Sequence, residues 1–167
     1  MPAAGSPSLT AVSAAHLLTP LGPAVVLASD SGVTALQFDE PHNVTLPISD
    51  IARHAARELA EYFALLRTSF TIPLVLPPPS FERSVLDALL KVPYGETCSY
   101  AEVANAAGHR GAARAAGSVL ARNELLVLLP CHRVLPATGD TGMFALGPSK
   151  KRFLLELERQ GTQNEFL

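Results

Sequence analysis

Cysteine and tryptophan are scarce in this chain of 167 residues, which contains two cysteines and no tryptophan. Cys98 and Cys131 lie far apart and form no C-x-x-C pair, which argues against a disulfide framework and against a cysteine-rich zinc site. Two unpaired thiols fit a reducing compartment, so we expect an intracellular protein.

Long apolar runs are also missing. No stretch of about 18 apolar residues is available to span a membrane, and the N-terminus lacks the basic and apolar segments of a secretory signal. We therefore expect neither a membrane span nor export. Hydrophobic residues nevertheless make up 48% of the chain, which is enough for one compact domain or two small ones without disulfide support.

Basic charge is not in excess overall, because the net charge is −2, but it is unevenly distributed. Residues 1–108 hold five basic and ten acidic side chains, whereas residues 109–152 hold seven basic and two acidic ones. A basic segment of this kind predicts contact with nucleic-acid phosphates. The run at 150–152, taken by itself, is more often just a solvated helix end.

The N-terminal part has the pattern of a small sheet covered by a helix. Short β-prone runs separated by turn residues predict an antiparallel meander, with strands at 14–18, 24–28 and 33–38. Apolar residues then recur at three- and four-residue intervals over 50–67, which predicts a helix with one face on this sheet.

Successive prolines at 77–79 cannot continue a helix and favour a stiff extended connection, so we place a domain boundary there. We expect a flexible N-terminus at 1–12, an α/β scaffold domain at 13–76, and a mainly helical domain at 77–167.

The C-terminal part has helix signals in close succession, over 81–91, 100–107 and 112–122. Ser80 is a candidate N-cap for the first of these helices, and Ser99 with Glu102 forms a capping-box pattern before the second. A glycine-containing turn at 108–111 separates the second helix from the third. The last two helices therefore have the size of a helix-turn-helix.

The most unusual stretch is 125–134, in which five branched aliphatic residues precede Pro130, Cys131 and His132. The apolar run is short and ends at a proline, so we predict a buried strand that fixes Cys131 on a rigid scaffold. A thiolate is a nucleophile and His132 is the nearest base, but adjacent side chains diverge, which favours a bridging water over a direct hydrogen bond. Taken alone, a buried cysteine is more often a small packing residue.

The sequence around this cysteine, Pro130-Cys131-His132-Arg133-Val134, resembles the active-site signature of the O6-alkylguanine-DNA alkyltransferases. Residues 93–104 and 111–117 match the helix-turn-helix of that family, and Asn123 and Glu158 stand at the family's distances from the cysteine. Four separated motifs in the same order and spacing argue against a chance match.

The resemblance implies an α+β fold, in which a small antiparallel β-meander with a helix precedes a mainly helical domain with a winged-helix-like helix-turn-helix. It implies DNA repair by a single-turnover methylated-DNA–protein-cysteine methyltransferase that needs no cofactor and no metal ion. The expected partner is double-stranded DNA containing O6-alkylguanine, bound through the minor groove by a monomer in the cytoplasm, nucleoid or nucleus.

The resemblance also assigns roles to the catalytic residues. Cys131 is the alkyl acceptor, His132 takes its proton through water, and Glu158 holds the imidazolium. Asn123 organises the segment by hydrogen bonds to the backbone, although an asparagine after a helix is also an ordinary helix-terminal residue. Tyr100 contacts the flipped nucleotide and assists protonation of the departing guanine; otherwise it is an ordinary half-buried aromatic residue.

On the same basis, Arg114 fills the place of the extruded base, whereas a lone helical arginine is otherwise a surface charge. The small residues around it fit the narrow minor groove, or else pack closely against another helix. The expected DNA contacts are Ser99, Ala113, Arg114, Ala115, Gly117 and Arg122. The expected substrate pocket comprises Tyr100, Leu120, Val134, Phe144 and Ala145.

The chain departs from the family pattern at two places. Where the family's substrate loop has a tyrosine and paired glycines, this chain has Met143-Phe144-Ala145-Leu146-Gly147, so a hydroxyl is missing and a glycine has become leucine. Glu124 replaces a proline after the asparagine. The altered loop predicts a changed pocket and a changed lesion preference.

Two other classes of protein compete with the transferase. A non-catalytic alkylation-lesion sensor or a helix-turn-helix regulator would share the DNA-binding features, but sensors of this kind lack the reactive cysteine that is present here as Cys131. A metal-binding module is a weaker alternative, because the chain lacks cysteine ligands for zinc.

Overall fold

The computed structural model describes residues 10–38 and 44–164. The chain divides into two compact units, Met1–Leu76 and Pro77–Leu167. Of the terminal segment expected to be flexible, residues 1–9 lie outside the described part of the chain.

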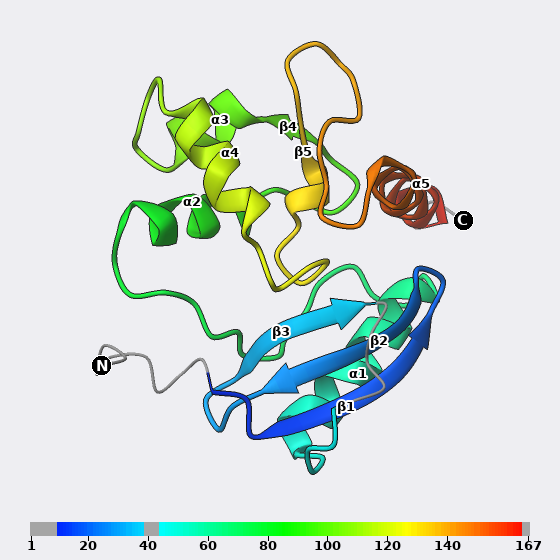
Figure 1. Cartoon of the computed structure of the whole chain (residues 1–167). Coiled ribbons are helices and arrows are strands. Elements are labelled where there is room, and N and C mark those ends of the chain that lie inside the picture. Colours follow the sequence, from blue (N-terminus) through cyan, green and yellow to red (C-terminus); the bar gives the residue numbers. More distant parts are fainter. Residues whose placement is uncertain (1–9, 39–43, 165–167) are drawn as a thin grey trace. The chain divides into compact units, whose positions relative to one another are not determined.

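The first unit contains a three-stranded antiparallel sheet in the order β1-β2-β3 (Figure 1). Its strands are β1 (Ser13–Thr19), β2 (Gly22–Ala28) and β3 (Val33–Phe38). A tight turn joins the first two strands, and Gly22 adopts a φ of 115° there, which side chains with a Cβ rarely tolerate. The predicted meander is confirmed.

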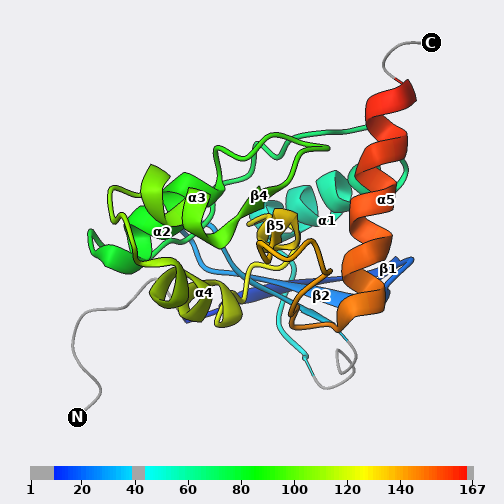
Figure 2. The same ribbon diagram turned by 90° about the horizontal axis from the view of Figure 1, so that it is seen from above.

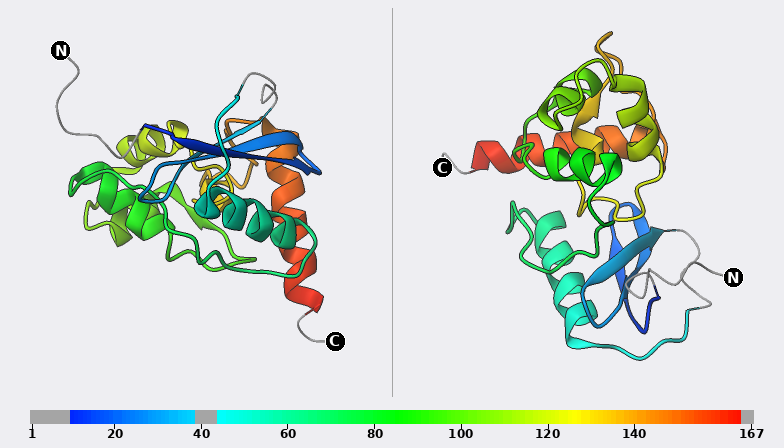
Figure 3. Two further views of the ribbon diagram at one scale, coloured as in Figure 1. Left: turned by 90° about the horizontal axis from the view of Figure 1, so that it is seen from below. Right: turned by 90° about the vertical axis from the view of Figure 1, so that its left-hand side faces the viewer.

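Helix α1 (Asp50–Phe63) packs against one face of this sheet (Figures 1 and 3). Ser49 caps its N-terminus, since its side chain accepts a hydrogen bond from the backbone N–H of Ala52. The expectation that this helix continues to residue 67 is wrong. The chain leaves the helix after Phe63, and Leu65 adopts a left-handed φ of 62°, which a right-handed helix cannot contain.

The second unit is mainly helical. Its elements are α2 (Phe81–Leu89), β4 (Cys98–Ser99), α3 (Tyr100–Ala106), α4 (Ala113–Ala121), the 3-10 helix η3 (Cys131–Arg133), β5 (Val134–Leu135) and α5 (Pro148–Asn164). The short strands β4 and β5 pair in parallel. Helices α2, α3 and α4 lie on one side of this pair, and α5 lies on the other (Figures 1 and 2).

The helix starts in this unit follow local sequence signals. Ser80 accepts a hydrogen bond from Arg83 N, and Ser99 and Glu102 form the predicted capping box at the start of α3. Between α3 and α4 the chain turns at Gly108 and Gly111, whose φ values are 84° and 82°. The α+β class is confirmed, whereas the winged-helix-like detail stays a prediction.

Helix α5 approaches the turn at 93–95 closely. It begins at Pro148, and a proline is tolerated there because an N–H at the first helical position would have no acceptor within the helix. A Cβ at Gly161 would collide with the Tyr94 hydroxyl, so this glycine permits the approach.

Nowhere in the described part of the chain is a helix both long and apolar enough to cross a membrane.

Candidate active site

The apolar run 125–129 forms a tight turn, so the predicted buried strand is wrong. Leu129 N donates to Leu125 O at 2.8 Å, and Val127 has a φ of 70°, which branched side chains rarely adopt. All five side chains are nevertheless buried. An apolar run predicts burial, but it does not distinguish a strand from another buried conformation.

Asn123 holds this turn against Cys131, which begins η3 and is 9% exposed. Its Nδ2 donates to Leu129 O at 3.2 Å and lies 3.2 Å from Cys131 Sγ, while its Oδ1 accepts from Leu125 N at 2.9 Å. Asn123 also follows Arg122, the C-cap of α4, and its N–H donates to Leu120 O at 3.2 Å, so it lies at the end of a helix and also bridges to the backbone near the thiol.

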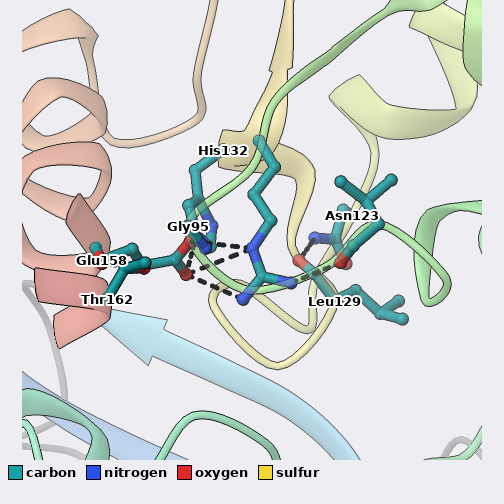
Figure 4. Close-up of polar contacts among 8 residues, drawn as sticks. Gly95, Asn123, Leu129, His132, Glu158 and Thr162 are labelled. Carbon is teal, nitrogen blue, oxygen red and sulfur yellow. Dashed lines mark hydrogen bonds and ion pairs between the residues drawn. The ribbon is translucent and has the colours of Figure 1, made fainter. Parts of the chain in front are cut away.

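His132 and Glu158 form a buried pair, with the glutamate supplied by α5 (Figure 4). Their atoms Nε2 and Oε1 are 2.8 Å apart, and the two residues are 0% and 1% exposed. An ionised carboxylate can only accept hydrogen bonds, so Nε2 carries the shared proton and Nδ1 is the basic nitrogen. Among the described residues, Nδ1 of His132 is buried without a hydrogen-bond partner.

Arg133 binds the same carboxylate from a second direction. Its Nε lies 2.9 Å from Glu158 Oε2, its Nη2 lies 2.8 Å from Oε1, and its Nη1 donates to Val92 O at 2.7 Å. Gly95 N adds a hydrogen bond to Glu158 Oε2 at 3.1 Å (Figure 4). Glu158 therefore ties η3, α5 and the turn before β4 to one carboxylate.

These contacts determine the resting protonation states. Burial alone would raise the pKa of Glu158, but hydrogen bonds from His132 and Arg133 lower it to about 2. Burial lowers the pKa of His132, and Glu158 only partly opposes that shift. Burial raises the pKa of the Cys131 thiol, although a hydrogen bond from Asn123 partly opposes this. At neutral pH the carboxylate is charged, whereas the imidazole and the thiol are neutral.

Tyr100 lies at the start of α3 and is half-buried. Its ring faces α4, where a Cβ at Gly117 would lie 3.6 Å away. Burial raises the pKa of its phenol, and the nearby Cys131 adds to this effect, so the hydroxyl is a proton donor at neutral pH. Ser99 pairs with Leu135 across β4 and β5, which brings the start of α3 beside the segment that follows η3.

The residues predicted to contact DNA lie on or next to α3 and α4. Arg114, Ala115 and Arg122 are exposed, and Ser99, Ala113 and Gly117 are partly exposed. Their exposure leaves this surface open to a partner.

The predicted pocket residues differ in burial. Leu120 and Val134 are 7% and 0% exposed, whereas Phe144 is partly exposed and Ala145 is exposed. The loop at 143–147, which was expected to contact the substrate, turns at its end, where Gly147 N donates to Phe144 O at 2.9 Å. The structure thus buries Leu120 and Val134 in the core and leaves Phe144 and Ala145 nearer the surface.

Two buried cations, Arg133 and Lys151, are absent from the predicted site. Lys151 is 0% exposed, and its Nζ donates to Val134 O at 2.7 Å and to Met143 O at 3.3 Å. Their burial corrects two expectations: the run 150–152 is not simply a solvated helix end, and the charge available to DNA is smaller. The exposed basic side chains of that segment are Arg110, Arg114, Arg122 and Arg152.

The position of Arg133 inside the signature motif is a signal that it belongs to the site. Nothing local in the sequence marks Lys151 as buried. Within residues 10–38 and 44–164, no group of three or more His, Cys, Asp or Glu side chains is arranged to hold a metal ion.

Comparison with known proteins adds three findings. Residues 80–160 match the family model for the DNA-binding domain of 6-O-methylguanine DNA methyltransferase. A methylated-DNA–protein-cysteine methyltransferase from Mycobacterium leprae is 40% identical over 146 residues, covering 84% of this chain and 88% of the relative. The constitutive enzyme of that name from Bacillus subtilis is 34% identical over 151 residues, covering 84% and 92% of the two chains.

The same similarity extends to solved structures. The crystal structure of Mycobacterium tuberculosis OGT in complex with DNA aligns with a TM-score of 0.81 and 37% identity. The alignment covers 90% of this chain and 94% of that one. Both units of the chain therefore fall within the similarity.

Proposed function

The chain belongs to the 6-O-methylguanine DNA methyltransferase family, and from this we propose that it repairs DNA by moving an alkyl group from O6-alkylguanine to Cys131. Its activity is that of a methylated-DNA–protein-cysteine methyltransferase, and its partner is DNA. The assignment of individual residues to the reaction is the proposal.

The observation that supports the assignment most strongly is the buried pair of His132 and Glu158, in which His132 directly follows Cys131 in the chain. Because Glu158 accepts the Nε2 proton, His132 presents an unprotonated Nδ1 as the general base. A neutral imidazole next to a neutral thiol is the state from which proton transfer begins.

The reaction is an in-line displacement at the alkyl carbon. The Cys131 thiol gives its proton to His132 through a bridging water, the sulfur forms a bond to the alkyl carbon, and the bond between that carbon and guanine O6 breaks. The electron pair stays on the guanine, which takes up one proton. One proton leaves the thiol and one joins the guanine, so no oxidant or reductant is needed.

Tyr100 and Asn123 assist at the two ends of this displacement. The neutral phenol of Tyr100 donates a proton or hydrogen bond to the departing guanine. Asn123 donates to Cys131 Sγ, and this hydrogen bond favours the thiolate as it forms.

The DNA surface is formed by α3 and α4. A stacked base cannot present its O6 substituent to a buried sulfur, so the damaged nucleotide must be flipped out of the helix. Exposed Arg114 takes the place of the extruded base, and the small residues Ala113, Ala115 and Gly117 let α4 enter a minor groove about 6 Å wide. Ser99 and Arg122 contact the DNA backbone at the two ends of this surface.

All proposed site residues come from one chain, so the protein acts as a monomer. The chemistry requires a free thiol and DNA, which fits a reducing intracellular compartment. The thioether product is stable, so each molecule reacts once. A non-catalytic lesion sensor or regulator is not favoured, because the relatives are named as methyltransferases.

Intact-protein mass after incubation with excess duplex containing O6-methylguanine tests this proposal. The wild-type protein should gain one methylene of mass per molecule, and repair should stop after one equivalent. Cys131→Ser should gain none while still binding the duplex. Repeated turnover by the wild type, or an unchanged protein mass with repaired DNA, would contradict the proposal.

A further inference from the structure

Three buried residues share the Glu158 carboxylate, and their charges must balance. His132, Arg133 and Glu158 are 0%, 8% and 1% exposed, so an unbalanced charge among them is costly. Arg133 supplies a permanent positive charge against the single negative charge of Glu158. The set is therefore neutral only when the imidazole of His132 is uncharged.

We infer that Arg133 is a positioning residue for the alkyl transfer: it serves as the counterion of Glu158 and thereby keeps His132 a neutral base. The role of counterion would otherwise fall to His132. An imidazolium paired with Glu158 has no free lone pair on Nδ1, so it cannot accept the thiol proton.

The geometry of Arg133 suits this role. Its fork engages both carboxylate oxygens, with Nε 2.9 Å from Oε2 and Nη2 2.8 Å from Oε1, whereas His132 reaches only Oε1. The guanidinium is fixed from behind, because Nη1 donates to Val92 O and the group lies 5.7 Å from the Tyr94 ring centroid. Arg133 therefore makes the stronger of the two interactions with the Glu158 carboxylate.

The other charged groups around His132 act in the same direction as Arg133. Lys151, on α5, is buried and cationic, and its charge also disfavours an imidazolium. Cys131 is a neutral thiol at rest and adds no charge. Among the described residues, Glu158 is the one charged side chain that favours a charged His132, so its neutralisation by Arg133 is the controlling contact.

This inference rests on the proposed function, but its test reads the protonation of His132 directly, so the two can fail separately. Long-range proton–nitrogen NMR spectra of the full chain, with His132 assigned by comparison with His132→Gln, report the charge and tautomer of the ring. In the wild type at neutral pH we expect a neutral ring with its proton on Nε2. An imidazolium in the wild-type protein would overturn the inference.

Arg133→Met removes the counterion and should leave His132 charged at neutral pH. The acid limb of Cys131 alkylation by iodoacetamide should move up by about 1–3 pH units, because loss of a nearby cation raises the pKa of the imidazole and of the thiol. A loss of packing alone would lower stability without moving this limb. An unchanged His132 titration in the Met variant would overturn the inference.

Two further variants complete the test. Arg133→Lys keeps a cation and should keep His132 neutral, even if its shorter reach lowers thermal stability; an imidazolium in the folded Lys variant at neutral pH would also overturn the inference. Arg159→Met is the matched control, because Arg159 follows Glu158 on α5 but pairs with exposed Glu156. Its His132 titration should equal that of the wild type.

Discussion

Among the residues that the structure describes, each unit contains one fully buried glutamate with an arginine and a histidine as partners. In the first unit, Glu58 is 0% exposed, with Arg67 Nη1 at 3.4 Å and His54 Nε2 at 3.3 Å. In the second, Glu158 is paired with Arg133 and His132 at 2.8 Å each. The residue types are the same, but the chemistry differs.

The two clusters differ in the surroundings of the histidine. The side chain of His54 is 44% exposed, and Glu58 also accepts hydrogen bonds from Thr71 and Ile72, so this cluster fastens the chain that follows α1. His132 is completely buried, and the residue before it in the chain is the proposed nucleophile Cys131. On the proposed mechanism, a carboxylate with the same types of partner therefore serves folding in one unit and proton transfer in the other.

The largest expected effect separates these two roles. Glu158→Gln should slow alkyl transfer by about 10²–10⁴, because the base loses the group that fixes its tautomer. Glu58→Gln should leave the rate per folded molecule unchanged and cost about 1–3 kcal/mol of unfolding free energy. Single-turnover rates and urea unfolding of both variants measure this; equal rate losses in the two would break the comparison.

Acid should weaken both clusters in the same direction. The pKa of Glu158 falls from 4.5 to about 2 on folding, and that of Glu58 is also lowered, by hydrogen bonds and Arg67 that outweigh burial. The unfolded chain then binds more protons in this window, so stability present above pH 4.5 is lost as the pH falls toward 2. For Glu158 the loss is on the order of 3 kcal/mol. Urea unfolding between these limits should show a smaller acid loss in Glu158→Gln than in the wild type, and an equal loss would contradict this account.

Replacing an exposed arginine should also affect repair in the second unit but not in the first. Arg114→Ala should slow repair of duplex DNA by about tenfold or more, and slow reaction with free O6-benzylguanine much less, because the free base needs no flipping. Arg53→Ala, an exposed arginine on α1, is the matched control and should change neither rate. Parallel single-turnover assays decide the point; equal losses on both substrates for Arg114→Ala would indicate damage to the fold.

The smallest expected effect concerns the substrate loop. Phe144 lacks the hydroxyl of its family counterpart, and a lost hydrogen bond is worth about 0.5–1.5 kcal/mol, or up to roughly tenfold in rate. Leu146 adds bulk where the family has glycine. We expect activity on O6-methylguanine DNA with weak reaction toward O6-benzylguanine, partly restored in a Phe144→Tyr, Leu146→Gly double variant. A wild type that is already fast on benzylguanine would show that this loop does not set substrate choice.

Local signals predicted much of the fold, because they act over a few residues. The turn around Gly22, the N-cap at Ser80 and the capping box at Ser99 each need only neighbouring side chains. The end of α1 was not predictable in this way. The apolar periodicity continues to Leu66, but Leu65 adopts a left-handed φ that ends the helical path, and Leu66 is 78% exposed.

The site depends more on contacts between distant segments. The motif resemblance brought Cys131, His132 and Glu158 together as candidates, and the structure places the last two in hydrogen-bond contact. The conformation of 125–129 was missed because a buried turn and a buried strand share one apolar pattern. The burial of Lys151 was missed because it depends on two backbone carbonyls, Val134 O and Met143 O, that no local pattern reveals.

Peptide mapping after reaction with a duplex containing O6-methylguanine tests the central claim most directly. The chain offers an internal control, because Cys98 is a second free thiol whose pKa is raised by burial and by Glu102. We predict that the methyl group is recovered on Cys131 and that Cys98 is unmodified. Recovery of the methyl group on Cys98 alone, with Cys131 unmodified, would contradict the account.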